Sequence, residues 1–295
     1  MKKRSTISGM DIKNVTVLGA GVLGAQIALV TAFRGFNVVS WDINDDALAA
    51  AAKRFDAFGA RIVADLDDAT EESMTEGRAR LTQTTDLEEA VREADLIIEA
   101  VPENIDIKRD VLGRASAAAS DATIFATNTS TLLPSEFADA VSSPERFLAL
   151  HFANNIWIQN TAEIMPHAGT DLKYVDVLVD FAERIGMVPV KLKKEQPGYI
   201  LNTLFVPWLK AGQYLLANEI AEPADIDRTW RNSTGSPRGP FEIMDIVGLR
   251  TVLAVGRAQG NKEEWQDKFS SILEEMIAAG HIGVESGQGF YTYDK

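Results

Sequence analysis

Hydrophobic and polar positions form two kinds of block along the first two thirds of the chain. Short apolar runs predict buried strands, and between them apolar residues recur every three or four positions, as in helices. Strands are expected at 13–18, 37–41, 95–101, 123–127, 146–152, 162–165 and 188–192. Helices are expected at 22–34 and 45–64, with a short helix near Glu71. This alternation predicts an α/β domain with a doubly wound, mostly parallel sheet covered on both faces.

The pattern changes after Leu192, where the strand signals stop. The segment KKEQPG at 193–198 is interpreted as a junction, and helical spacing continues beyond it. We therefore expect two domains, an α/β domain at 1–194 and a smaller all-helical domain at 195–295.

A glycine-rich turn joins the first expected strand to the first expected helix. Gly19, Gly21 and Gly24 form the pattern G-x-G-x-x-G, with Val22 and Leu23 before the last glycine. The first glycine permits a tight turn, the second lets a pyrophosphate approach the backbone, and the third lets helix and strand pack closely. The helix N-terminus offers N–H groups to the diphosphate. This context predicts a Rossmann-type dinucleotide-binding domain, and the alternative is that the glycines serve only the turn.

Asp42 follows the second expected strand, 18 positions after Gly24. Its carboxylate can accept hydrogen bonds from the adenosine ribose hydroxyls and would repel a 2′-phosphate. Residues 43–46 supply no arginine to bind such a phosphate. NAD is therefore the predicted cofactor rather than NADP. The alternative is that Asp42 caps the following helix.

Few residues are available for acid–base chemistry, because the chain has no cysteine and only three histidines. His151 ends an apolar strand, in the region where ligand sites of doubly wound sheets gather. Glu163 lies 12 residues on, at the start of the next expected strand, so a loop between adjacent strands could bring the pair within hydrogen-bond reach. A structural histidine in the core is the alternative, and it is the interpretation kept for His167 and His281.

The chain resembles the 3-hydroxyacyl-CoA dehydrogenase family over nearly its whole length. The matching segments, in the family's order, are the glycine turn, DLIIEAVPE at 95–103 with Lys108, NTS at 128–130, HFAN at 151–154 with Glu163, GYILN at 198–202, GPFEIMDIVGL at 239–249 and GQGFY at 287–291. The segment HFANNIWIQNTAEIM is similar to a bacterial branch that includes diketone-reducing enzymes. L-gulonate 3-dehydrogenase and lambda-crystallin are other relatives.

The resemblance implies roles for four catalytic residues. His151 would remove the hydroxyl proton while hydride leaves the same carbon for the nicotinamide, and it would return a proton in the reverse direction. Glu163 would hold the imidazole in the productive tautomer and favour its cationic form. Ser130 and Asn202 would hydrogen-bond the substrate oxygens. The alternatives are a strand-end cap for Ser130 and a helix–helix hydrogen bond for Asn202.

Three further residues would line the ribose and nicotinamide end of the cofactor by the same resemblance, namely Glu103, Lys108 and Asn128. The alternative for Lys108 is a solvated helix residue. For Asn128 it is a strand-end cap.

The implied reaction is the NAD-dependent interconversion of a short-chain 3-hydroxyacyl-CoA, such as 3-hydroxybutyryl-CoA, and its 3-ketoacyl-CoA. The helical domain would supply a wall of the substrate cleft and the interface of a homodimer. Three departures bear on the substrate: Asn155 replaces a usual proline, Glu285 replaces a common lysine, and the acidic segment 65–72 suits a phosphorylated nucleotide poorly. A free diketo or polyhydroxy acid is therefore the alternative substrate, and a non-catalytic NAD-binding structural protein is the remote alternative.

The bulk composition narrows the partners further. A formal net charge of −14 argues against nucleic acid, whose phosphates require a basic surface. No uninterrupted apolar run reaches the roughly 18 residues of a membrane span. The start MKKRSTISGMD lacks the apolar core of a secretory signal. These features predict a cytoplasmic protein without a membrane partner, and the absence of cysteine excludes thiolate metal sites.

Overall fold

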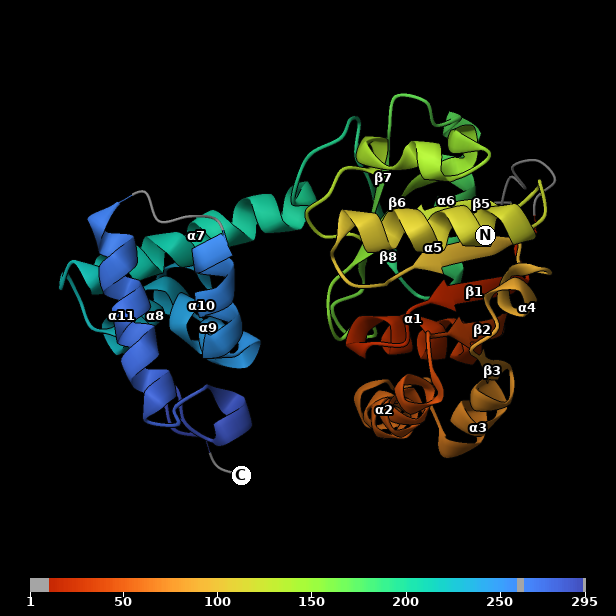
Figure 1. The fold of residues 1–295 in the computed structure, drawn as a ribbon. Helices are drawn as coiled ribbons and strands as arrows, with labels where there is room; N and C mark the ends of the chain where they lie inside the picture. The colour runs from red at the N-terminus through yellow and green to blue at the C-terminus, as the bar shows by residue number, and fades with distance from the viewer. Residues whose placement is uncertain (1–10, 259–262, 294–295) are drawn as a thin grey trace. The chain divides into compact units, whose positions relative to one another are not determined.

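The computed structural model describes residues 11–258 and 263–293. The chain divides into two compact units, Met1–Ile200 and Leu201–Lys295. Figure 1 shows a layered α/β unit and a unit built of helices. The predicted fold class, a Rossmann-type sheet followed by a helical unit, is confirmed.

The described residues of the first unit form an eight-stranded sheet in the order β3-β2-β1-β4-β5-β6-β7-β8. Its strands are β1 Asn14–Leu18, β2 Asn37–Trp41, β3 Leu81–Thr84, β4 Leu96–Glu99, β5 Ile124–Thr127, β6 Phe147–Phe152, β7 Thr161–Pro166 and β8 Val188–Lys191. Neighbouring strands from β3 to β6 run parallel, β6 and β7 pair antiparallel, and β7 and β8 are again parallel. The carboxyl ends of β1, β4, β5 and β6 therefore lie at one edge of the sheet.

Helices cover both faces of this sheet (Figure 1). The helices are α1 Val22–Phe33, α2 Asp45–Asp65, α3 Glu71–Ala79, α4 Leu87–Val91, α5 Ile105–Ala118 and α6 Leu172–Arg184. One buried cluster joins the sheet to α1, α2, α3 and α6, and a second joins it to α4 and α5. The central strands β1, β4, β5 and β6 are largely apolar because they are buried on both faces, as in other parallel sheets.

The strand β3 and three short 3₁₀ helices were not predicted. β3 has the sequence LTQT, and only Leu81 is buried. An edge strand buries few side chains, so its hydrophobic signal is weak. The 3₁₀ helices Pro134–Glu136, Ala138–Ala140 and Pro144–Arg146 lie between β5 and β6. Each has only three residues, too few for a periodic pattern.

The second unit is helical in its described residues. Its elements are α7 Tyr199–Ala217, which begins just before the division, α8 Pro223–Thr234, α9 Pro240–Val247, α10 Leu249–Ala258, α11 Glu264–Ala278 and the 3₁₀ helix Val284–Ser286. Phe241, Met244 and Leu249 are at the centre of its core.

Two buried aspartates give the motifs GPFEIMDIVGL and GQGFY a structural purpose. Asp227 accepts hydrogen bonds from the backbone N–H groups of Phe241 and Glu242, at 3.0 and 2.9 Å. Asp245 accepts from the N–H groups of Phe290 and Tyr291, at 2.9 and 3.0 Å. These carboxylates tie the start of α9 and the C-terminal segment into the helical core.

Candidate active site

At two of the three glycines in the glycine turn, packing within the protein leaves no room for a Cβ, and at the third it does. Gly19 has φ +102°, and a Cβ there would lie 2.6 Å from the carbonyl oxygen of Ala100. A Cβ at Gly24 would overlap the carbonyl oxygen of Gly19. At Gly21 an added Cβ would meet no atom within 4 Å. Packing within the protein therefore explains the first and third glycines, but not the second.

The open space at Gly21 lies at the start of a helix. Gly21 is the N-cap of α1 and supplies no side-chain cap hydrogen bond, so the first N–H groups of the helix, from Val22 onward, are available to an outside acceptor. Val22 is exposed. Backbone donors, a helix dipole and absent side-chain bulk together suit a diphosphate. The residues present therefore fit a dinucleotide.

Asp42 lies beside this turn. Its Oδ2 accepts a hydrogen bond from the N–H of Ala20 at 2.7 Å, and its Oδ1 accepts from the N–H of Ile43 at 2.7 Å. The N-cap of α2 is Asn44, whose side chain accepts from the N–H of Ala47. The alternative that Asp42 caps this helix is therefore wrong.

Arg54 is a neighbour of the turn that the sequence pattern did not single out. It lies on α2, and its Nη1 donates to the carbonyl oxygen of Ala20 at 3.2 Å. Residues 43–46, which directly follow Asp42, contain no cation. The fold of α2 brings a cation from further along the chain to the glycine turn.

A buried ion group lies at the carboxyl ends of β4 and β5. Lys108 is 1% exposed, and its Nζ contacts Glu99 Oε1 at 2.8 Å and Glu103 Oε2 at 3.3 Å. Thr127 Oγ1 donates to the other carboxylate oxygen of Glu99 at 2.7 Å. Burial raises the pKa of the Glu99 carboxyl, and the Lys108 charge opposes this shift. Lys108 is thus a paired buried charge, and the alternative of a solvated helix residue is wrong.

Glu103 holds the turn that follows β5. Its Oε1 accepts hydrogen bonds from Thr129 Oγ1 at 2.6 Å, from the N–H of Ser130 at 2.9 Å, and from the N–H and hydroxyl of Thr131 at 2.8 Å each. Partial burial favours the neutral carboxyl, but the bonds from Thr129 and Thr131 and the charge of Lys108 prevail and lower the pKa of Glu103 to about 2. Glu103 is therefore a carboxylate that fixes the position of Ser130.

Asn128 connects the ends of two strands. Its Oδ1 accepts a hydrogen bond from the N–H of Phe152 at 2.9 Å, which links the end of β5 to the end of β6. This contact matches the strand-end alternative for Asn128. Its predicted contact with the cofactor stays a prediction.

His151 and Glu163 form a buried pair at the same edge of the sheet. They are directly opposite each other in the antiparallel pairing of β6 and β7. His151 Nδ1 lies 3.0 Å from Glu163 Oε2, and the two residues are 4% and 3% exposed. His151 Nε2 lies 3.3 Å from Ser130 Oγ. Because the carboxylate accepts a hydrogen bond from Nδ1–H, Nε2 is left to exchange a proton with another group.

The first residues of α7 cover this pair. The ring of Tyr199 is stacked on the imidazole of His151, and the N–H of Ile200 donates to Glu163 Oε1 at 2.9 Å. Neither residue was identified from the sequence as part of the site. Their only signal was their place in the segment GYILN, from which Asn202 alone was selected.

The loop between β6 and β7 is bound to α1 and α2. The N–H of Asn155 donates to Gln26 Oε1 at 2.7 Å, and Arg61 donates to Asn155 Oδ1 at 3.1 Å. Trp157 Nε1 donates to Asp65 Oδ2 at 2.8 Å, and the Arg61 guanidinium lies 5.0 Å from the centre of the Trp157 ring. Asn155 has φ +60°. Proline fixes φ near −65° and lacks an N–H, so the usual proline could not adopt this loop conformation.

His167, His281 and Asn202 complete the set of residues singled out from the sequence. His167 Nε2 lies 3.0 Å from the carbonyl oxygen of Pro144, which matches a structural role. His281 is partly buried in the helical unit. Asn202 is partly buried on α7 in the same unit, so its approach to the substrate stays a prediction.

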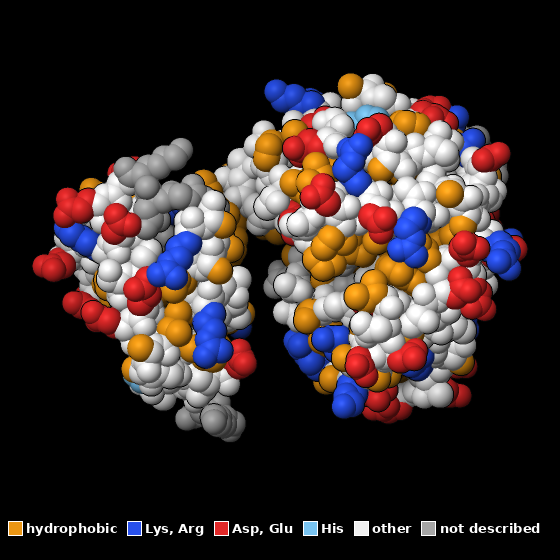
Figure 2. Space-filling view, viewed as in Figure 1, with side chains coloured by type: hydrophobic (Ala, Val, Ile, Leu, Met, Phe, Trp, Pro, Cys, Tyr) orange, Lys and Arg blue, Asp and Glu red, His pale blue; other side chains and the backbone are white. Residues whose placement is uncertain are grey.

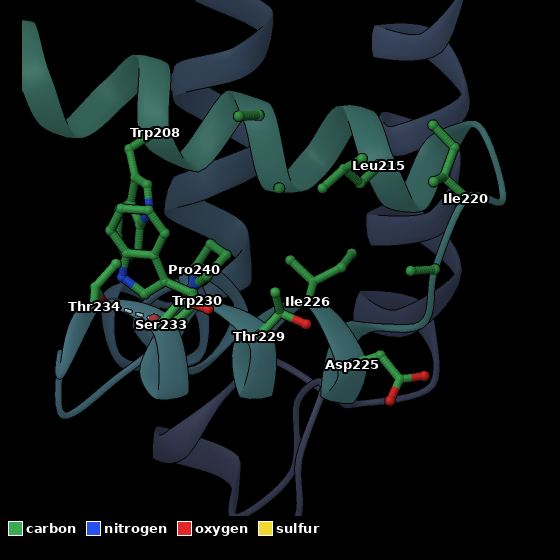
Figure 3. Close-up of a pocket in the computed structure, with 13 residues that line it drawn as sticks. Trp208, Leu215, Ile220, Asp225, Ile226, Thr229, Trp230, Ser233, Thr234 and Pro240 are labelled. Carbon is green, nitrogen blue, oxygen red and sulfur yellow. Dashed lines mark hydrogen bonds between the residues drawn. The ribbon is translucent and has the colours of Figure 1, made fainter.

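An apolar groove lies within the helical unit, between α7 and α8 (Figure 3). Trp208 and Trp230 line one part of it with ring centres 5.3 Å apart, and Leu215, Ile220 and Ile226 line the rest. Asp225 lies on the same helix as Ile226, but its carboxylate points away from Ile226 (Figure 3). The lining of this groove is therefore mostly apolar.

Within residues 11–258 and 263–293, no group of three or more His, Asp or Glu side chains is arranged to hold a metal ion. In the same residues, no helix combines the length and hydropathy needed to cross a membrane.

Comparison with known proteins covers both units. The model of the 3-hydroxyacyl-CoA dehydrogenase NAD binding domain matches residues 14–196, and that of the C-terminal domain matches residues 198–293. Human mitochondrial hydroxyacyl-coenzyme A dehydrogenase is 34% identical over 288 residues, 96% of this chain and 91% of that protein. A probable 3-hydroxybutyryl-CoA dehydrogenase of Bacillus subtilis is 30% identical, over 97% of this chain and 99% of that protein.

Solved structures agree with this result. A diketoreductase, described by its substrate-directed dual catalysis of dicarbonyl compounds, is 48% identical with a TM-score of 0.92, covering 97% of this chain and 100% of that one. The (S)-3-hydroxybutyryl-CoA dehydrogenase PaaH1 from Ralstonia eutropha is 28% identical with a TM-score of 0.82, covering 97% of this chain and 100% of that one. The resemblance inferred from the sequence is confirmed, and the chain belongs to the 3-hydroxyacyl-CoA dehydrogenase family, with an NAD-binding domain in its first part.

Proposed function

We propose that the protein is an NAD-dependent oxidoreductase that interconverts a short-chain 3-hydroxyacyl-CoA, such as 3-hydroxybutyryl-CoA, and its 3-ketoacyl-CoA. The observation that carries this proposal is the buried His151–Glu163 pair, whose Nε2 faces Ser130 at 3.3 Å. This pair lies at the same edge of the sheet as the glycine turn. An acid–base group and a dinucleotide site at one edge are what hydride transfer from an alcohol requires.

The cofactor contacts follow from the turn. The diphosphate of NAD would lie over Gly21 and the N-terminus of α1, where the protein leaves open space. Asp42 would accept hydrogen bonds from the adenosine ribose, and Glu103, Lys108 and Asn128 would support the nicotinamide end. When bound, NAD supplies the acceptor for the hydride.

Residues of the protein itself transfer the proton. In the oxidation, His151 Nε2 takes the hydroxyl proton as the C–H bond gives up its hydride and the C=O bond forms. Glu163 accepts a hydrogen bond from Nδ1–H and stabilises the imidazolium that results. Ser130, and Asn202 from the helical unit, would hydrogen-bond the substrate oxygens. In the reduction, the imidazolium returns the proton to the new alkoxide.

A second candidate substrate, a free diketo or polyhydroxy acid, is favoured by the charge of segment 65–72. This segment is acidic, which disfavours the phosphates of coenzyme A. The diketoreductase structure also shares more identity with this chain than the 3-hydroxybutyryl-CoA dehydrogenase structure does, 48% against 28%.

One substrate comparison tests both candidates. NADH oxidation would be followed by absorbance with acetoacetyl-CoA, free diketo esters and L-gulonate's keto product as separate substrates. A higher kcat/KM for acetoacetyl-CoA supports the acyl-CoA reaction, and a higher value for a free ketone supports the second candidate. NADH binding without turnover of any of these substrates would support a non-catalytic protein instead.

We propose that residues 1–194 bind the cofactor, that residues 195–295 form a wall of the substrate cleft and a homodimer interface, and that the protein is cytoplasmic. Exposed apolar side chains in the helical unit, including Leu204, Ile220 and Val255, support the dimer. Figure 2 shows apolar patches on the surfaces of both units. Light scattering tests the homodimer by measuring the oligomeric state. Cell fractionation tests the cytoplasmic location.

A further inference from the structure

The ring of Tyr199 lies flat against the imidazole of His151. The ring centres are 4.4 Å apart and the planes differ by 13°. Tyr199 is 0% exposed, and its φ of +54° is in the left-handed region, which a non-glycine residue adopts at an energetic cost. A buried side chain held in such a backbone conformation is placed there by several contacts at once.

Hydrogen bonds of Tyr199 and Ile200 support that placement. The hydroxyl of Tyr199 donates to the carbonyl oxygen of Thr129 at 2.8 Å, and the next N–H, of Ile200, donates to Glu163 Oε1 at 2.9 Å. Burial raises the pKa of the Tyr199 hydroxyl, so it remains a neutral donor. Residues 199 and 200 therefore contact the imidazole, its carboxylate partner and the turn that carries Ser130.

These contacts restrict a motion that the carboxylate alone leaves open. The hydrogen bond from Nδ1–H to Glu163 fixes the position of Nδ1 but allows the imidazole to tilt about the line joining the two atoms. Such a tilt would move Nε2, whose 3.3 Å distance to Ser130 Oγ is already at the long end for proton exchange. An aromatic ring stacked on one face blocks the tilt toward that face. It also presents its negative π-face to the imidazolium.

The alternative explanation for the buried position of Tyr199 is core packing. The residue does belong to a small buried cluster with Ala149, Met165 and Leu192. Packing alone, however, does not explain a hydroxyl directed at the residue before Ser130, or a ring plane parallel to the imidazole.

We propose that Tyr199 is a positioning residue: its ring fixes the plane of the His151 imidazole, and its hydroxyl fixes the turn of Ser130. Nε2 and the Ser130 hydroxyl are thereby directed at the same substrate oxygen. This inference rests on the proposed dehydrogenase function.

Two substitutions separate the ring from the hydroxyl. Tyr199→Leu removes the stacked ring and is expected to lower kcat by about 10- to 100-fold, the effect of a small misplacement of a reacting group. The KM for NADH should stay near the wild-type value, because the glycine turn is unchanged. Tyr199→Phe keeps the ring and loses one neutral hydrogen bond, so it should recover kcat to within about 5-fold of wild type.

A matched control is available in the same unit. Tyr174 on α6 is 2% exposed, and its ring contacts Arg146 and Lys173 rather than the imidazole. Tyr174→Leu should lower the melting temperature as a cavity-forming change does and leave kcat per folded molecule unchanged. Circular dichroism gives the folded fraction of each variant.

The outcomes are distinguishable. Wild-type kcat in Tyr199→Leu, or equal losses in the Tyr199 and Tyr174 variants, would overturn the inference. If Tyr199→Leu does not fold, NMR of the wild type decides: stacking predicts upfield-shifted ring protons for His151, and unshifted protons overturn it. If the wild type itself reduces no ketone with NADH, the proposed function fails and the inference fails with it.

Discussion

Replacing Glu163 by glutamine tests the proposed mechanism most directly. The carboxylate accepts hydrogen bonds from His151 Nδ1 at 3.0 Å and from the N–H of Ile200 at 2.9 Å. An amide has one oxygen and one NH₂ group, so it can accept from one of these donors but must oppose the other with a donor of its own. Glu163→Gln therefore removes the charge and also mismatches one hydrogen bond.

The size of the effect follows from the distance. A unit charge 3.0 Å from an imidazolium is worth about 5 kcal/mol at an effective dielectric constant of about 20. A neutral hydrogen bond that the amide retains recovers about 1 kcal/mol. The expected net loss is about 4 kcal/mol wherever the imidazolium forms in the reaction, or about 10³-fold in kcat.

The assay is the initial rate of NADH oxidation at saturating ketone. The control is Glu183→Gln, an exposed glutamate on α6, which should keep wild-type kcat. His151→Ala should lose several orders of magnitude, and the double variant should lose little more than His151→Ala alone, because the two residues act as a unit. A kcat within about threefold of wild type in Glu163→Gln, with His151→Ala inactive, would refute the steering role of the carboxylate.

Three further predictions concern the cofactor site and its supports. Gly21→Ala should fold normally, because its Cβ meets no protein atom within 4 Å, yet bind NADH weakly; Gly24→Ala should lower the melting temperature, because its Cβ overlaps Gly19. Asp42→Ala should raise the KM for NADH and narrow its preference over NADPH, which steady-state kinetics with both cofactors would show; an unchanged preference would contradict the ribose contact. The pKa of Glu103 is lowered from 4.5 to about 2, so its stabilising contribution is complete above pH 4.5 and is lost as the pH falls towards 2. Since its side chain is 36% exposed, the screened contribution is about 1–2 kcal/mol, and urea unfolding of Glu103→Gln should show this deficit at neutral pH but not near pH 2.

The local sequence was sufficient to predict those parts of the molecule whose structure depends on residues close together along the chain. The glycine turn, the acidic residue after β2 and most strands were predicted because each is encoded within a few consecutive residues. His151 and Glu163 belong to the same class: they lie on consecutive strands joined by a short loop, so their opposition in the sheet needed little knowledge of the fold.

Only the tertiary structure decided which groups meet across larger separations. Lys108 is typical of a solvated helix residue in sequence, and it is buried because the end of β4 supplies Glu99 beneath it. Asn155 adopts φ +60° because Gln26, from α1, accepts its N–H. Tyr199 reaches the imidazole because the chain returns to β6 after β8. These contacts join segments that chain spacing leaves unrelated, and burial determines their electrostatics, so no local pattern encodes them.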